Sequence, residues 1–337
     1  MTSTEYASVG GKLIQAGTAF KGRQGEDITV NQDYWDFGWI APERREPFQW
    51  DALEAAEKTL SEFKLEGKTD PTVTKVDLTE IWGHPDGVAA LGFKYPGTHQ
   101  LTGSCVGSGG GNTIFTLAAL EVLRLNDPEQ IFLPWWLYTY GRSRGNSGPG
   151  DGSLESTWAQ AAQNDGVINA NEPGLGLPKP DRIGELGYSY TESLEYKWSA
   201  GSRSPCKDLL EKGRKHLIKK VGIMRSADDV REAICNLYPV GEGSMYGYTD
   251  WVDADGLSLG KRGPRWSHKM CVLGWQLHPK HGELFKIVNQ WAGASTSSGK
   301  FNYVWVPKAD IDWICRDECR CYSQFDGFPA QTFKWTV

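Results

Sequence analysis

One segment of this chain is apolar on nearly every side. Residues 112–125 read Asn-Thr-Ile-Phe-Thr-Leu-Ala-Ala-Leu-Glu-Val-Leu-Arg-Leu, and the run ends before Asn126, Asp127 and Pro128. A helix with apolar residues all round is stable only in a protein interior. The segment therefore predicts a buried helix around which the rest of the chain packs.

The residues just before this helix are rich in glycine. Four of the six positions in 106–111 are Gly. Glycine costs about 1 kcal/mol per helical position relative to alanine, so we expect the first turn to be distorted or displaced. Close approach of another segment to the backbone is one reason for a chain to accept that cost.

The composition bounds the class of protein. At ~150 residues per domain, 337 residues correspond to about two domains or lobes. A net charge of −6 argues against a broad nucleic-acid surface, and no apolar run reaches the ~18 residues needed for membrane insertion. The residues from Met1 to Ala7 lack a signal-peptide pattern. The 7 cysteines are too scattered for a disulfide scaffold, so we expect a cytoplasmic, reducing location.

Helical patterns come before strand patterns along the chain. Residues 1–50 are expected to form an extended arm, and residues 68–104 an irregular segment punctuated by Gly and Pro. Besides 112–125, helices are predicted over 50–64, 153–164 and 226–237, the last with a capping box. Strands are predicted over 268–275, 284–289 and 301–306. This order predicts an α+β fold with two lobes.

Cys105 lies between a glycine-punctuated loop and the buried helix. A helix N-terminus carries roughly +0.5 charge and free N–H groups, which favour a thiolate. The same N–H groups could hold an oxyanion after the thiolate attacks a carbonyl. The alternative for any single cysteine is a buried structural role.

Two later positions could complete such a site. His268 begins an apolar strand, where a general base would be held rigidly. Asn289 ends another apolar strand, and Trp291 follows it after one residue. A carboxamide can hold an imidazole in one tautomer, and an indole can keep water from that contact.

The order and spacing of these residues resemble the papain-like cysteine peptidases. His268 is followed by Gly274 six residues later, and Asn289 by Trp291. The separations from Cys105 are 163 residues to His268 (268 − 105) and 184 to Asn289 (289 − 105). The family's usual separation is ~130–150, and the loops of 143–224 have room for the extra residues. Further segments resemble bacterial and phage-encoded members of the family. These segments are 132–167, 226–240 and 301–306.

The resemblance implies a papain-like two-lobe fold, with a helical lobe, an antiparallel β lobe and the active-site cleft between them. Residues 1–74 would form the N-terminal arm and helix. Residues 75–225 would form the mainly helical lobe with the nucleophile helix, and 226–337 the mainly β lobe that carries His and Asn.

The resemblance also implies the roles of individual residues. Cys105 would be the nucleophile, His268 its proton-transfer partner, Asn289 the group that orients the imidazole, and Trp291 a cover over that contact. It implies a peptide or protein substrate, and neither a cofactor nor a metal ion.

The chain departs from the family pattern near these residues. Gln100, the candidate oxyanion donor, stands five residues before the cysteine, where six is usual. Ser104 directly precedes Cys105 as a supporting residue, and Thr102 replaces the family's half-cystine. The usual Asn-Ser-Trp-Gly reads Asn-Gln-Trp-Ala over 289–292.

Other motifs are weaker. The glycines of 107–111 lack the lysine of a phosphate loop. Cys315, Cys319 and Cys321 have a spacing that suggests a metal site, but no histidine lies near them, and reduced structural cysteines are expected instead. Asp250, Asp253 and Asp255 resemble the start of a calcium loop without its glycine.

Three roles stay open from the sequence. The first is a cysteine peptidase acting through an acyl-thioenzyme. The second is an inactive or weakly active papain-like structural protein of a phage virion, whose arm contacts neighbouring subunits. In the third, residues 1–74 form a built-in inhibitory segment over the groove.

Overall fold

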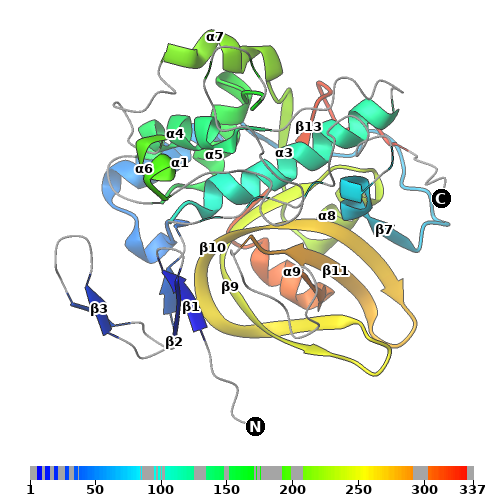
Figure 1. Cartoon of the computed structure of the whole chain (residues 1–337). Helices are drawn as coiled ribbons and strands as arrows, with labels where there is room; N and C mark the ends of the chain where they lie inside the picture. Colours follow the sequence, from blue (N-terminus) through cyan, green and yellow to red (C-terminus); the bar gives the residue numbers. More distant parts are fainter. Residues whose placement is uncertain are drawn as a thin grey trace.

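The fold was obtained as a computed structural model. It describes residues 38–83, 103–124, 134–147, 152–170, 192–198, 208–290 and 303–331, six single residues between them (85, 95, 98, 100, 172 and 175), and five short strands before residue 38. In Figure 1 the helices α3, α4 and α5 form one lobe, and the long strands β9 and β10 curl through the other. This arrangement confirms the predicted α+β architecture.

The helices gather mainly in the middle of the chain. The described α-helices are α1 (Pro47–Glu57), α3 (Cys105–Arg124), α4 (Trp136–Ser147), α5 (Glu155–Asn164), α6 (Glu192–Trp198), α7 (Leu210–Gly213), α8 (Ala227–Cys235) and α9 (Lys308–Ile314). Short 3-10 helices span Pro42–Arg44, Leu78–Gly83 and Arg214–His216. Among the described residues, no helix has both the length and the apolar character needed to cross a bilayer.

The described strands form one large sheet and two small hairpins. They are β1 (Tyr6–Val9), β2 (Lys12–Gln15), β3 (Ala19–Lys21), β4 (Asp27–Thr29), β5 (Tyr34–Asp36), β6 (Ser61–Glu62), β7 (Lys75–Asp77), β8 (Lys220–Ile223), β9 (Val240–Val252), β10 (Ser258–His278), β11 (Gly282–Val288), β12 (Tyr303–Pro307) and β13 (Glu318–Ser323). The large sheet has the order β11-β12-β10-β9-β13-β8-β6, and β5 and β7 also pair with β10.

Strand β10 curls the sheet onto itself. Its later part pairs antiparallel with β11, whereas Leu259 near its start pairs with Trp305 of β12. Because β12 also pairs with β11, the strands close into a half-barrel. The start of β10 therefore pairs with β12 and its later part with β11, and His268 lies between these two parts of the strand.

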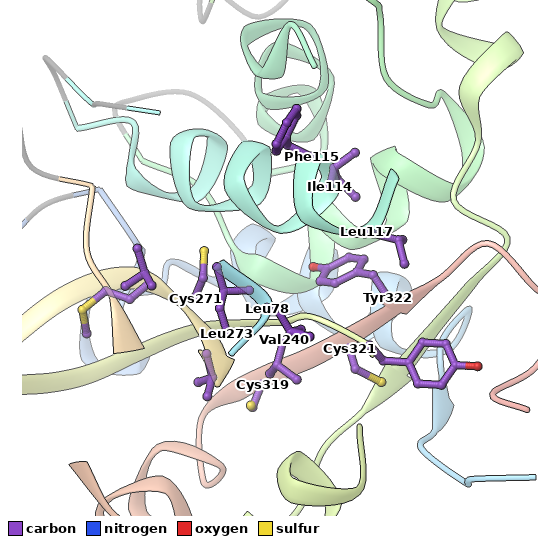
Figure 2. Close-up of a cluster of buried hydrophobic side chains, with 14 of the residues drawn as sticks. Leu78, Ile114, Phe115, Leu117, Val240, Cys271, Leu273, Cys319, Cys321 and Tyr322 are labelled. Carbon is purple, nitrogen blue, oxygen red and sulfur yellow. The ribbon is translucent and has the colours of Figure 1, made fainter. Parts of the chain in front are cut away.

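The main core lies between α3 and the sheet. Figure 2 shows Ile114 and Leu117 on α3 facing Leu273 of β10 and Tyr322 of β13. All four side chains are buried. Burial of one such aliphatic side chain stabilises the fold by about 1.5–3 kcal/mol. The prediction of a buried helix is confirmed for the described part of 112–125, since residues 112–124 are helical and the side chains of residues 112–120 are buried in this core.

The glycine-rich start of α3 is regular helix, so the expected distortion of its first turn is wrong. A Cβ at Gly107 would lie 2.6 Å from the Trp136 ring, and one at Gly110 would overlap the Trp158 ring. Aromatic side chains of α4 and α5 thus pack directly on the backbone of α3. Their burial offsets the helical cost of glycine, and the predicted close approach is confirmed.

Two helix starts differ in how well the sequence located them. Ser226 caps α8 through a capping box with Asp229, as predicted. The helix expected over 50–64 instead begins at Pro47 and ends at Glu57. Residues 61–62 form β6, which pairs with β8. The division of the chain at residues 75 and 226 stays a prediction.

Candidate functional site

Cys105 is the first residue of α3 and is fully buried. The carbonyl of Ser104 accepts the N–H groups of Gly107 and Ser108, both at 3.0 Å, and so starts the helix. The Cys105 sulfur accepts a hydrogen bond from the backbone N–H of Lys269 at 3.3 Å. Both the helix N-terminus and this donor favour a negatively charged sulfur. The thiol therefore meets β10 one residue after His268.

The His268 ring is held by Asn289. The distance from His268 Nε2 to Asn289 Oδ1 is 2.9 Å. Because a carboxamide oxygen only accepts, Nε2 carries the proton, and Nδ1 is the basic nitrogen of the neutral ring. Asn289 is itself fixed, since Oδ1 also accepts the N–H of Gln290 at 2.8 Å and Nδ2 donates to the Tyr248 hydroxyl at 3.4 Å. The structure thus joins His268 of β10 to Asn289 at the end of β11, and it brings the Cys105 sulfur of α3 to Lys269, the residue after His268.

Burial favours the neutral form of the His268 imidazole in this conformation. His268 has no exposed surface. Desolvation lowers its pKa to about 3, against a smaller opposing effect of the Asn289 hydrogen bond. The ring is therefore neutral at physiological pH while the site is closed.

The other candidate residues have separate positions. Gln100 is buried, and its backbone N–H donates to the Gln290 carbonyl at 3.0 Å, which places its loop beside Asn289. The Ser104 hydroxyl donates to Glu195 of α6 at 2.9 Å. Trp291 lies outside the described residues. The roles given to all these residues stay predictions.

The arm crosses the molecule beside this site. Strand β5 pairs in parallel with the three residues of β10 that precede His268, with Asp36 opposite Ser267. Gly38 follows at φ +108°, and a Cβ there would overlap the Gly103 carbonyl group. Strand β5 therefore lies beside the strand before His268, and Gly38 lies against Gly103 in the loop before Cys105.

The arm continues as part of the interior. Trp39 is fully buried, its carbonyl accepts the Ser267 hydroxyl, and its indole N–H donates to Glu318 at 3.1 Å. The Ile40 backbone N–H donates to the Ser153 carbonyl at 3.0 Å. We call residues 34–36 and 38–41 the covering segment. Its hydrogen bonds tie the arm to β10, β13 and the start of α5.

A buried ion pair lies behind the Cys105 thiol. Lys269 Nζ is 2.5 Å from Glu155 Oε2, and both side chains have no exposed surface. Lys269 also lies over the Trp158 ring at 4.2 Å, and Tyr322 donates to Glu155. Desolvation raises the pKa of Glu155, and Lys269 partly opposes that shift. The pair joins α5 to β10 directly behind the site.

Sequence reasoning missed Lys269, Glu155 and the side chain of Gln290. Lys269 is a single charge inside an apolar strand, between His268 and Met270. A lysine in such a run needs a buried anionic partner. That signal could have prompted a search for a carboxylate, although it could not have selected Glu155.

Two other motifs have structural explanations. Cys315, Cys319 and Cys321 are buried free thiols, and the neighbouring Cys315 and burial raise the pKa of Cys319. Asp253 closes the turn between β9 and β10. Its Oδ1 accepts the N–H groups of Asp255 and Leu257 at 3.0 and 2.9 Å, and its Oδ2 is 2.9 Å from His281 Nε2.

The comparisons with known proteins bear on the fold. The sequence matches no protein-family model and no curated protein. Among solved structures it is similar to xylellain, a cysteine protease from Xylella fastidiosa, with 14% identity and a TM-score of 0.51 over 88% of this chain and 99% of that chain. It is also similar to the digestive procathepsin L 3 of Tenebrio molitor larval midgut, with 11% identity and a TM-score of 0.49 over 82% of this chain and 79% of that chain. Together with the geometry above, the likeness to xylellain establishes a papain-like fold.

Proposed function

We propose that this chain is a papain-like cysteine peptidase that cleaves peptide bonds through Cys105, His268 and Asn289. The observation that supports the proposal is that Asn289 holds the His268 ring while the next residue, Lys269, contacts the Cys105 sulfur. The His268 ring is held at 2.9 Å by Asn289, and the Lys269 N–H reaches the Cys105 sulfur at 3.3 Å at the N-terminus of α3. The papain-like fold supports the same conclusion.

The chemistry follows from the roles these groups can take. His268 accepts the proton of the Cys105 thiol, and the thiolate attacks the carbonyl carbon of the scissile bond. The N–H groups at the start of α3 and Gln100 face the developing oxyanion. The C–N bond breaks as the imidazolium gives its proton to the leaving amine. Water, deprotonated by His268, then hydrolyses the thioester and regenerates the thiol.

Selective labelling tests the proposal. Iodoacetamide should alkylate Cys105 faster than Cys235 and Cys271, two of the other buried cysteines, whose pKa values burial raises to about 12. Peptide mapping after a short exposure locates the label, and Cys105→Ser should abolish both the fast label and any cleavage of casein. Equal labelling of the three cysteines, together with no cleavage, would overturn the proposal.

The closed site favours a second candidate, the structural protein of a phage virion. Cys105 and His268 have no exposed surface, and the arm contributes five strands, a form suited to pairing with neighbouring subunits. In that role Cys105 would stay unreactive when the covering segment is displaced, and removal of residues 1–33 would abolish assembly. Assembly can be measured by sedimentation, independently of labelling.

A further inference from the structure

The side chain of Gln290 joins the two segments that carry the candidate nucleophile and base. Its Nε2 group donates to the Cys105 carbonyl at 3.3 Å and to the Lys269 carbonyl. The Gln290 side chain is fully buried. A primary amide has two hydrogens, so one nitrogen can satisfy one carbonyl on α3 and another on β10.

The start of α3 is built to admit this amide. A Cβ at Gly109 would lie 3.3 Å from Gln290 Nε2 and 3.1 Å from Lys269 Cγ. Any larger residue at position 109 would crowd both side chains. The glycine therefore lets the Gln290 amide reach the helix backbone.

The backbone of Gln290 holds the remaining parts of the site. Its N–H donates to Asn289 Oδ1 at 2.8 Å, on the oxygen that also accepts His268 Nε2. Its carbonyl accepts the Gln100 N–H at 3.0 Å. One residue thus contacts the segments of Cys105, His268, Asn289 and Gln100.

We propose that Gln290 is a positioning residue that fixes the separation between the Cys105 thiol and the His268 ring. The inference rests on the proposed function. Because the Lys269 N–H already reaches the Cys105 sulfur, a shift between α3 and β10 would weaken that contact as well. Displacement of a catalytic pair by about 1 Å can cost on the order of 100-fold in rate.

The test is the pH dependence of Cys105 alkylation by iodoacetamide in the full chain. In the wild type, the half-maximal rate should fall well below the ordinary cysteine pKa of about 8.5, because the N-terminus of α3 and the Lys269 N–H stabilise the thiolate. Gln290→Met keeps the length but removes both donors, so the midpoint should rise by about one pH unit, a tenfold loss of rate at low pH. The Cys105→Ser variant measures the background alkylation of the other cysteines.

A structural control separates positioning from general loss of stability. Asn236 is also a buried carboxamide, and its Nδ2 donates to Thr69 at 2.9 Å and to the Glu232 carbonyl at 2.8 Å, neither of which belongs to α3 or β10. Asn236→Leu should lower the melting temperature and leave the alkylation midpoint unchanged. Should Gln290→Met fail to fold, Gln290→Glu retains the shape and, when protonated, one donor. Its midpoint should lie above that of the wild type.

The outcomes distinguish the two proposals. A low wild-type midpoint that is unchanged in both Gln290 variants overturns the positioning role and leaves the peptidase proposal in place. A wild-type midpoint at or above about 8.5 overturns the peptidase proposal, and the role of Gln290 falls with it.

Discussion

At the scale of single residues, the free energy of unfolding should be sensitive to the loss of either partner of the buried ion pair. Lys269 and Glu155 are 2.5 Å apart with no exposed surface. Removal of one member of a buried pair leaves the other without compensation and costs about 3–5 kcal/mol. Lys269→Met should therefore lower the free energy of unfolding in urea by an amount near the lower end of that range, because the Glu155 pKa is already raised and the carboxyl can take up a proton.

The double variant separates the pair from the packing of the lysine stem. Lys269→Met with Glu155→Met replaces both charges by apolar groups, and such replacements are often neutral or stabilising. We expect the double variant to regain most of the loss. A double variant less stable than the single one would contradict this account.

Glu242 gives a prediction about pH. It is buried on β9, and desolvation, with smaller contributions from Asp317 and Glu155, raises its pKa well above the ordinary 4.5. The folded protein thus retains a proton that the unfolded chain releases, so stability falls as pH rises above 4.5 towards the folded-state pKa. Glu242→Gln should raise the melting temperature at pH 8 by about 2 °C or more and leave it unchanged near pH 4.

An exposed carboxyl group, that of Glu54, should give the opposite dependence of stability on pH. Glu54 has a pKa lowered by its hydrogen bond and ion pair with Lys58. Glu54→Gln should cause a small loss of stability that is present at pH 8 and absent at low pH. Thermal unfolding of both variants from pH 3 to 8 measures the two pH dependences, because the Glu54 contribution is lost only as pH falls through its lowered pKa. Parallel curves for the two variants would contradict the assignment.

At the scale of elements, α3 should respond to alanine differently from other helices. Alanine at an ordinary helical glycine stabilises by about 0.5–1 kcal/mol, but a Cβ at Gly110 would overlap the Trp158 ring. Gly110→Ala should destabilise the protein by about 1–3 kcal/mol.

Gly145 in α4 is the matched control, since a Cβ there would meet no atom within 4 Å. Gly145→Ala should stabilise by the ordinary amount. Urea unfolding of both variants measures the contrast, and a gain at both positions would show that the aromatic packing on α3 is loose.

The sequence predicted elements better than it predicted contacts between them. The apolar run of 112–125 and the capping box at Ser226 are local patterns, and both predictions are confirmed. The partners of Lys269 and Gln290 come from segments more than 100 residues away in sequence, on α5 and α3. No local pattern encodes such pairs, because they depend on how the elements pack. The regular start of α3 was mispredicted for the same reason, since intrinsic propensity disfavours glycine there.

At the scale of the whole molecule, the covering segment lies beside the buried site, and we predict that it limits access to Cys105. Its backbone lies beside both the Gly103 loop and the β10 residues before His268. Alanine at Gly38 would be strained at φ +108° and would overlap the Gly103 carbonyl group. Such strain costs on the order of 1–3 kcal/mol, and each 1.4 kcal/mol is tenfold in an equilibrium constant. Gly38→Ala should therefore speed iodoacetamide labelling of Cys105 by about tenfold or more.

Two controls test whether the faster labelling is specific to Gly38. Gly256 also has a positive φ, +80°, but a Cβ there would lie in open space, so Gly256→Ala should leave the labelling of Cys105 unchanged. The buried Cys271 should stay protected in both variants, which excludes global unfolding. Equal rates at Cys105 in Gly38→Ala and the wild type would show that the segment does not limit access.

The burial of Cys105 beside the covering segment has a practical consequence for screening. A fluorogenic peptide or a folded protein is too bulky to reach a sulfur with no exposed surface, so intact protein would register as inert even if every catalytic group were sound. A compact electrophile samples brief openings that a bulky reporter misses. Inactivity in a standard turnover assay would thus report that the substrate cannot reach Cys105, and it would not test the catalytic residues.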